Sequence, residues 1–182
     1  MHFPIEINPF GHRKGIAKRA LALASAALAG FLIFACGQGR FQAVPSKIDD
    51  FKGQLVEGGV SNYRTEKGRA TLIVLTASWC PGCRAELPHL KKLDSEFQGE
   101  GFKILLISED DTPQTAASYN RNAHISWTTF HWNYEIMNAL GNPGVIPVSY
   151  LVNAQDSIVK IDVGGFNENE MRSLIKDLIA TK

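Results

Sequence analysis

Two cysteines separated by two residues, Cys80 and Cys83, follow directly on the apolar run 71–77. Nearly continuous apolarity over a run of this length is typical of a strand buried on both faces, as at the centre of a sheet. The apolar residues of segment 81–97 recur at the spacing of an amphipathic helix. The sequence therefore predicts a strand that leads into a helix, with both cysteines at the junction.

This placement gives the two thiols different roles. The first turn of a helix brings side chains three residues apart close enough to form a disulfide. A thiolate at a helix N-terminus faces unpaired N–H groups, which lower a cysteine pKa from about 8.5 to roughly 3.5–7.5. Cys80 is therefore expected to attack a partner disulfide, and Cys83 is expected to resolve the mixed disulfide. The pair predicts a dithiol–disulfide exchange centre.

Other uses of the cysteine pair agree less well with the sequence. A structural zinc site needs a second pair of ligands, and the third cysteine, Cys36, lies far upstream in an apolar segment. Attachment of a c-type haem needs His after the second cysteine, where this chain has Arg84. A purely structural disulfide would close a very small loop and add little stability. No metal site is predicted.

The run from Trp79 to Cys83, followed by Glu86 and Pro88, resembles the thioredoxin superfamily, most closely its envelope branch typified by TlpA and ResA. In that branch a Trp-Cys-x-x-Cys motif precedes a Glu and then a Pro. The resemblance implies an α/β, thioredoxin-like fold over residues 48–182, with a central mixed sheet flanked by helices. It also implies a thiol–disulfide oxidoreductase that needs no cofactor besides its redox-active disulfide.

The dipeptide Ile146-Pro147 opens an apolar run that resembles the cis-proline strand of the same superfamily. In relatives this proline faces the active disulfide, and its missing N–H leaves the neighbouring backbone free to pair with an incoming peptide. The alternative is an ordinary trans proline at the first residue of a strand.

Glu86 follows Cys83 by one helical turn, so the two side chains are expected on the same face of the helix. A partly buried carboxylate with a raised pKa would accept the proton that Cys83 loses during resolution. Thioredoxin itself places a buried Asp six residues before its first cysteine, where this chain has Val74. The alternative is a solvated glutamate on an exposed helix face.

Segment 1–35 has the pattern of an export leader, because a basic stretch precedes the apolar run 20–35. The run is somewhat shorter than the roughly 20 residues that span a bilayer. Its end resembles a bacterial lipobox, in which Cys36 would receive lipid, although Phe34 is bulky for that motif. Residues 36–47 are expected to form a tether. An uncleaved signal anchor and soluble secretion remain alternatives.

The net charge of +1 arises from the basic leader, and the remainder is slightly acidic, so nothing indicates nucleic-acid binding. The expected function is reduction of disulfides in exported proteins, of which apocytochrome c is one candidate, on the periplasmic side of a bacterial envelope. The resemblance implies a membrane electron donor of the CcdA or DsbD type. Pro81 and Gly82 lie between the cysteines, and the sequence does not predict whether they raise or lower the redox potential.

Three other functions stay open at this point. A disulfide oxidase of the same fold would keep every residue and differ only in potential. A peroxidase would need the peroxiredoxin pattern before the catalytic cysteine, and Ala77 does not match it. A copper-handling module would use Cys80, Cys83 and a histidine such as His131.

The rest of the chain alternates between strand and helix patterns. An N-terminal hairpin or irregular strands are expected within 51–69, and a solvated acidic turn at 109–111. Further strands are expected at 102–107, 126–132, 148–152 and 157–163, and helices at 112–122, 135–140 and 167–180.

Overall fold

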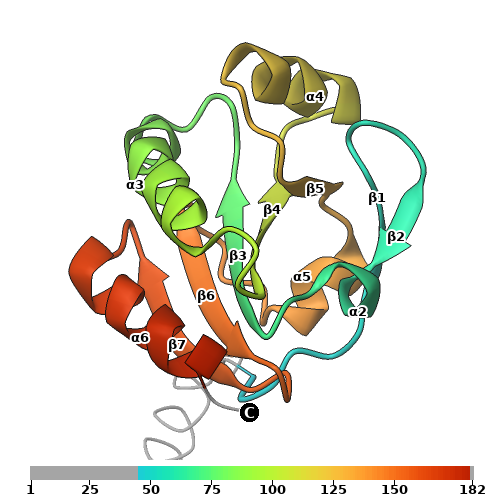
Figure 1. Ribbon diagram of the computed structural model, residues 1–182. Helices are drawn as coiled ribbons and strands as arrows, with labels where there is room; N and C mark the ends of the chain where they lie inside the picture. The colour runs from blue at the N-terminus through green and yellow to red at the C-terminus, as the bar shows by residue number, and fades with distance from the viewer. Residues whose placement is uncertain (1–44, 181–182) are drawn as a thin grey trace, which may run out of the picture. The chain divides into compact units, whose positions relative to one another are not determined.

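The computed structural model describes residues 45–180, which contain one five-stranded sheet and a separate two-stranded hairpin. The strands of the main sheet lie in the order β5 (Thr128–His131), β4 (Phe102–Ser108), β3 (Ala70–Thr76), β6 (Val148–Asn153) and β7 (Ile158–Val163). Strand β4 runs parallel to β3 and β5, whereas β6 is antiparallel to β3 and β7. The sheet is mixed, and β3 is its central strand, as the apolar run predicted (Figure 1).

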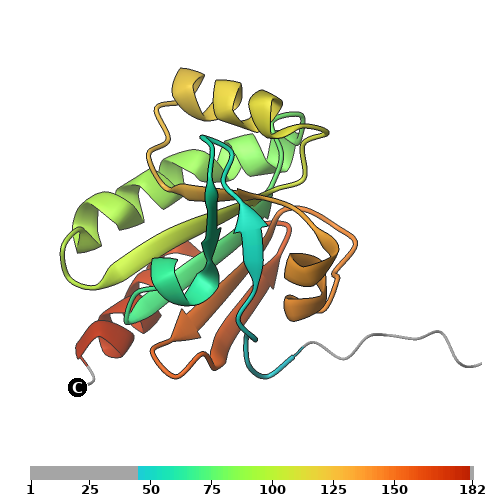
Figure 2. The same ribbon diagram turned by 90° about the vertical axis from the view of Figure 1, so that its right-hand side faces the viewer.

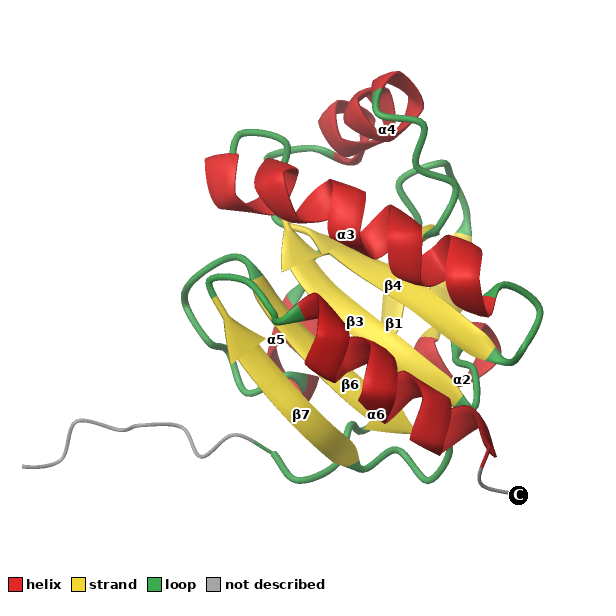
Figure 3. Cartoon of the chain, turned by 60° about the vertical axis from the view of Figure 1, so that its left-hand side comes forward, coloured by secondary structure: helices red, strands yellow, loops and turns green. Residues whose placement is uncertain are grey.

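Five helices surround the sheet in the described part of the chain: α2 (Tyr63–Glu66), α3 (Pro81–Phe97), α4 (Pro113–Asn122), α5 (Tyr134–Ala139) and α6 (Glu168–Ala180). Helices α3 and α6 lie side by side on one face of the sheet (Figure 3). The hairpin and α5 cover the opposite face (Figure 2). Strand β5 is an edge strand, and the segment β4–α4–β5 forms a crossover between parallel strands.

Successive residues of β3 contribute to two different cores, because side chains alternate across a strand. Leu72 and Val74 pack with residues of α3 and α6. Ile73 and Leu75 pack with Phe51 and with residues of α5 on the other face. All four β3 side chains are buried, so the end of this strand, where the cysteine motif begins, is held from both sides.

The N-terminal segment differs in part from the expectation. Strands β1 (Lys52–Gln54) and β2 (Val60–Asn62) form the predicted antiparallel hairpin. The next residues, expected as an irregular strand, begin with the short helix α2. The Asn62 side chain caps this helix by accepting a hydrogen bond from the Thr65 N–H at 2.9 Å. Capping, together with complete burial of Tyr63, favours one helical turn here.

The predicted leader at 1–35, Cys36 and most of the predicted tether at 36–47 lie outside the described residues. Among the helices of residues 45–180, none is both long and apolar enough to cross a membrane.

Candidate active site

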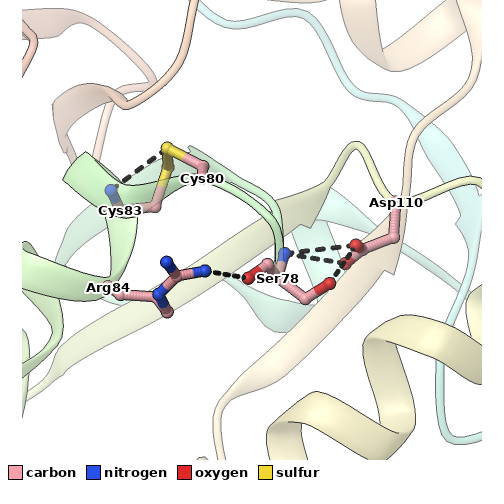
Figure 4. Close-up of a disulfide and its surroundings, with 5 residues drawn as sticks. All are labelled: Ser78, Cys80, Cys83, Arg84 and Asp110. Carbon is pink, nitrogen blue, oxygen red and sulfur yellow. Dashed lines mark hydrogen bonds between the residues drawn. A yellow bond between two sulfur atoms is a disulfide. The ribbon is translucent and has the colours of Figure 1, made fainter.

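Cys80 and Cys83 form a disulfide at the N-terminus of α3, with their Cα atoms 5.3 Å apart (Figure 4). Cys80 is the N-cap residue, Pro81 begins the helix, and the Cys83 N–H donates to the Cys80 Sγ at 3.1 Å. Both cysteines are largely buried, at 4% and 6% exposure. In the reduced protein the same N–H and the helix dipole would stabilise a thiolate on Cys80.

The loop before Cys80 is anchored by a carboxyl group that the sequence did not reveal. Asp110 accepts a hydrogen bond from the Ser78 hydroxyl at 2.6 Å and one from the Ser78 N–H at 3.1 Å. It also accepts from the Ser108 hydroxyl at 2.9 Å. Because Asp110 is only 1% exposed, the expectation of a solvated turn at 109–111 is wrong for this residue.

A signal for this contact did exist in the sequence. Thr76 and Ser108 pair at the carboxyl ends of the parallel strands β3 and β4. Residues that follow such paired ends lie at the same edge of the sheet, so Ser78 and Asp110 are brought together. Arg84 adds a second restraint, since its guanidinium donates to the Ser78 carbonyl at 2.8 Å (Figure 4). The loop that carries the attacking sulfur is therefore held from α3 and from β4.

Pro147 lies against the turn between the cysteines. The Ile146–Pro147 peptide bond is cis, as the resemblance implied. A Cβ atom built on Gly82 would lie 3.3 Å from the Pro147 Cδ, so the proline ring packs directly on the cysteine turn. The Ile146 side chain packs against the cluster of Ala77 and the two cysteines. The structure thus brings together the two motifs that the sequence placed 60 or more residues apart.

Glu86 is buried on the same helix as the cysteines, at 6% exposure, rather than solvated. Among the described residues, 45–180, neither of its carboxylate oxygens has a hydrogen-bond partner. Burial raises the pKa of Glu86 to about 7, and the Asp162 carboxylate adds to this rise. The Phe166 backbone and His89 lower the pKa and so offset part of this rise, but neither forms a hydrogen bond with the carboxylate oxygens. At neutral pH such a group can accept or release a proton.

The surface around the disulfide is apolar and accessible. Trp79, just before Cys80, is 59% exposed, and Val145, just before Ile146, is 50% exposed. Neither large side chain is required by the core. Such exposed apolar residues beside a reactive sulfur are typical of a surface that contacts another protein.

The residues of the copper-handling alternative are not gathered into one site. The His131 Nε2 lies 2.9 Å from the Asp110 carbonyl oxygen, so this ring nitrogen is already engaged. Within residues 45–180, no group of three His, Cys, Asp or Glu side chains is arranged to hold a metal ion.

The fold and the site define a class of protein: a thioredoxin-like chain with an exchangeable disulfide at a helix N-terminus is a thiol–disulfide oxidoreductase. Residues 43–179 match the model of the Redoxin family, and the chain belongs to that family. It is 26% identical over 140 residues to the thiol-disulfide oxidoreductase ResA of Halalkalibacterium halodurans, covering 74% of this chain and 76% of the relative.

A second relative agrees with this assignment, and two solved structures share the fold. The thioredoxin-like protein YneN of Bacillus subtilis is 26% identical over 128 residues, covering 67% of this chain and 72% of the relative. A thiol:disulfide interchange protein from Chlorobium tepidum matches with a TM-score of 0.66 at 22% identity, over 75% of this chain and 98% of that one. StoA from Bacillus subtilis matches with a TM-score of 0.59 at 20% identity, over 72% and 99%. These structures support the fold.

Proposed function

We propose that this oxidoreductase reduces disulfides in exported proteins, with cytochrome c maturation as one setting. The observation that carries the proposal is the position of Glu86, a buried carboxylate on the same helix as the cysteine pair. A negative charge near the sulfurs disfavours the thiolate form of the reduced pair. A reduced pair whose thiolate is less stabilised gives up its electrons more readily. This favours reduction of the partner disulfide over oxidation of partner thiols.

The exchange proceeds in two displacements. The Cys80 thiolate attacks one sulfur of the partner disulfide, and the other partner sulfur leaves as a thiolate that takes up a proton. Cys83 then loses its proton to Glu86, attacks the Cys80 sulfur and releases the second partner thiol. Two electrons pass to the partner, and the Cys80–Cys83 disulfide remains. No cofactor besides this disulfide is part of the proposal.

The oxidised pair must then be reduced again. An oxidising envelope compartment does not supply these electrons, so a membrane donor of the CcdA or DsbD type completes the proposed cycle. Lipid attached at Cys36 would keep the domain on the outer side of the membrane and close to that donor. The export leader at 1–35 and the family resemblance support this location.

Trapping of partners tests the proposal. In Cys83→Ser the mixed disulfide on Cys80 lacks its resolving thiol, so we expect disulfide-linked partners to accumulate in cells and to be identified by mass spectrometry after non-reducing electrophoresis. Cys80→Ser is the matched control, since it retains Cys83 but not the attacking sulfur. A Cys83→Ser variant that traps no more protein than Cys80→Ser would contradict the proposed function.

A further inference from the structure

A groove of about 420 Å³ opens between the carboxyl end of β4, the residues after β5, and α5. We call it the acidic aromatic groove. Its main lining residues are Glu109, Asp111, Trp132, Tyr134, Met137 and Gly144. The mechanism above uses none of them.

The aromatic side of the groove is exposed without a structural reason. Tyr134 is 81% exposed and Trp132 is 37% exposed. Their rings stack edge to face, with centroids 6.0 Å apart and planes at 76°. An aromatic pair of this kind offers ring faces and edges to a ligand, and ring faces attract cations.

The acidic side of the groove lacks a cation. Among residues 45–180, no hydrogen bond or ion pair is formed by the Glu109 or Asp111 side chains. Glu109 is partly buried, and burial raises its pKa because no positive charge offsets the desolvation. A positively charged group placed between these carboxylates and the aromatic rings would gain from both.

Two segments of the groove wall continue in the chain into residues that contact the cysteine turn or the loop before it. Gly144 precedes Pro147 by three residues, and consecutive Cα atoms are about 3.8 Å apart, so the groove wall begins within about 11 Å of the proline that packs on the cysteine turn. Asp110, which holds the loop before Cys80, lies between the two acidic groove residues. An extended peptide advances about 3.3 Å per residue. It would bridge the groove and the disulfide in about three to five residues.

We propose that the acidic aromatic groove binds a lysine or arginine side chain of the partner protein, about three to five residues from the partner cysteine that Cys80 attacks. This inference rests on the proposed disulfide exchange and adds a sequence preference to it. Charge complementarity sets the occupant, since the groove presents two carboxylates and the aromatic pair.

Peptide disulfides that release thionitrobenzoate test the proposal. Each probe carries one cysteine joined to thionitrobenzoate, with lysine, norleucine or glutamate four residues away on either side. The Cys80 thiolate attacks the peptide sulfur and thionitrobenzoate leaves; Cys83 then displaces the peptide thiol. Reduced full-length protein should react about fivefold to tenfold faster with the lysine probe than with the glutamate probe at low salt, and the ratio should fall as salt rises.

Substitutions in the groove test whether its residues cause the preference for the lysine probe. In the double variant Glu109→Gln, Asp111→Asn, the lysine-to-glutamate rate ratio should fall below about twofold, and Tyr134→Ser should reduce the lysine-to-norleucine ratio. Glu100→Gln is the matched control, because this exposed carboxylate lies at the opposite end of β4 and should leave both ratios unchanged. The neutral disulfide 2,2′-dithiodipyridine, which has no peptide and no charge, should react equally with all variants.

The outcomes separate the two proposals. If neither 2,2′-dithiodipyridine nor any peptide reacts faster than with a small-molecule thiol, the proposed function fails. If 2,2′-dithiodipyridine reacts rapidly and the peptide ratios stay near one, the groove proposal alone fails. A concentration-dependent dimer in sedimentation that the double variant abolishes would also overturn it, because a second copy would then occupy the groove.

Discussion

At the scale of single residues, Glu86 is the group whose environment departs most from that of an ordinary side chain of its type. Its pKa is raised from 4.5 to about 7 by burial, and both oxygens lack partners. A buried carboxylate without hydrogen bonds costs free energy when charged. The protein therefore keeps at this position a residue that reduces its stability at neutral pH, which is consistent with a role in proton transfer.

Glu86→Gln should separate the stability and activity effects. The folded pKa is raised, so the contribution of Glu86 to stability is fully present below pH 4.5 and is lost as pH rises to about 7. The variant cannot ionise at this position. Its free energy of unfolding, relative to wild type, should increase by about 3 kcal/mol between pH 4 and pH 8 in urea titrations. Release of the peptide thiol should slow about tenfold or more at pH 8 and lose its rise near pH 7.

Glu100→Gln again provides the control, since its carboxylate is exposed and distant from the cysteines along the chain. An unchanged pH profile for thiol release in Glu86→Gln would show that Cys83 loses its proton to another acceptor. A stability difference that does not vary with pH would show that the Glu86 carboxylate is not desolvated in solution.

The sequence predicts the site residues whose pattern lies within one short segment, and it does not predict those that come together only in the fold. Cys80, Cys83 and Glu86 lie on one helix, so their spacing alone fixes their common face. Asp110 belongs to a run of acidic residues, and such a run gives no sign of which member is buried. Its partner Ser78 is 32 positions away, and only the pairing of β3 with β4 brings them together.

At the scale of secondary-structure elements, Asp110 connects three of them. It follows β4, accepts hydrogen bonds from the loop that links β3 to α3, and thereby fixes where the helix with the disulfide begins. Asp110→Ala removes the acceptor for the Ser78 N–H and hydroxyl and for the Ser108 hydroxyl. Buried donors without partners cost about 1–3 kcal/mol, so the free energy of unfolding of the variant, measured in urea titrations, should be lower by that amount.

The same variant should also react more slowly, by about threefold to tenfold with the neutral disulfide 2,2′-dithiodipyridine, because Cys80 would no longer be held in one position. Asp111→Ala is the matched control. Its side chain is exposed and forms no hydrogen bond within the described residues, so both stability and the reaction with 2,2′-dithiodipyridine should stay close to wild type. Equal effects of the two substitutions would show that Asp110 does not position the loop.

The sequence predicts closely the helix with a strong apolar periodicity, α3, but it does not predict the short helix α2. The pattern of apolar residues placed α3 at 81–97, and the structure has Pro81–Phe97. Helix α2 is a single turn, too short for a periodic pattern, and its stability comes from the Asn62 cap and from the burial of Tyr63 against Phe51. Tertiary packing of this kind has no local signature.

At the scale of the whole molecule, the stability of the fold reports the direction of electron flow. Oxidised and reduced protein are linked by a thermodynamic cycle to the oxidised and reduced unfolded chains. If the folded pair has a lower potential than the same pair in the unfolded chain, the oxidised protein is the more stable form. A strong oxidant shows the opposite order, because its reduced form is stabilised.

For a reductase we therefore expect the oxidised protein to have the larger free energy of unfolding at pH 7, by about 1.4 kcal/mol or more, equivalent to about 30 mV for this two-electron couple. Urea titrations with and without a phosphine reductant measure the difference, and the double variant Cys80→Ser, Cys83→Ser should show none. The difference in free energy of unfolding between the oxidised and the reduced protein should increase above pH 7, where the charged Glu86 destabilises a Cys80 thiolate. In Glu86→Gln this difference should be smaller. A more stable reduced form would instead identify a disulfide oxidase.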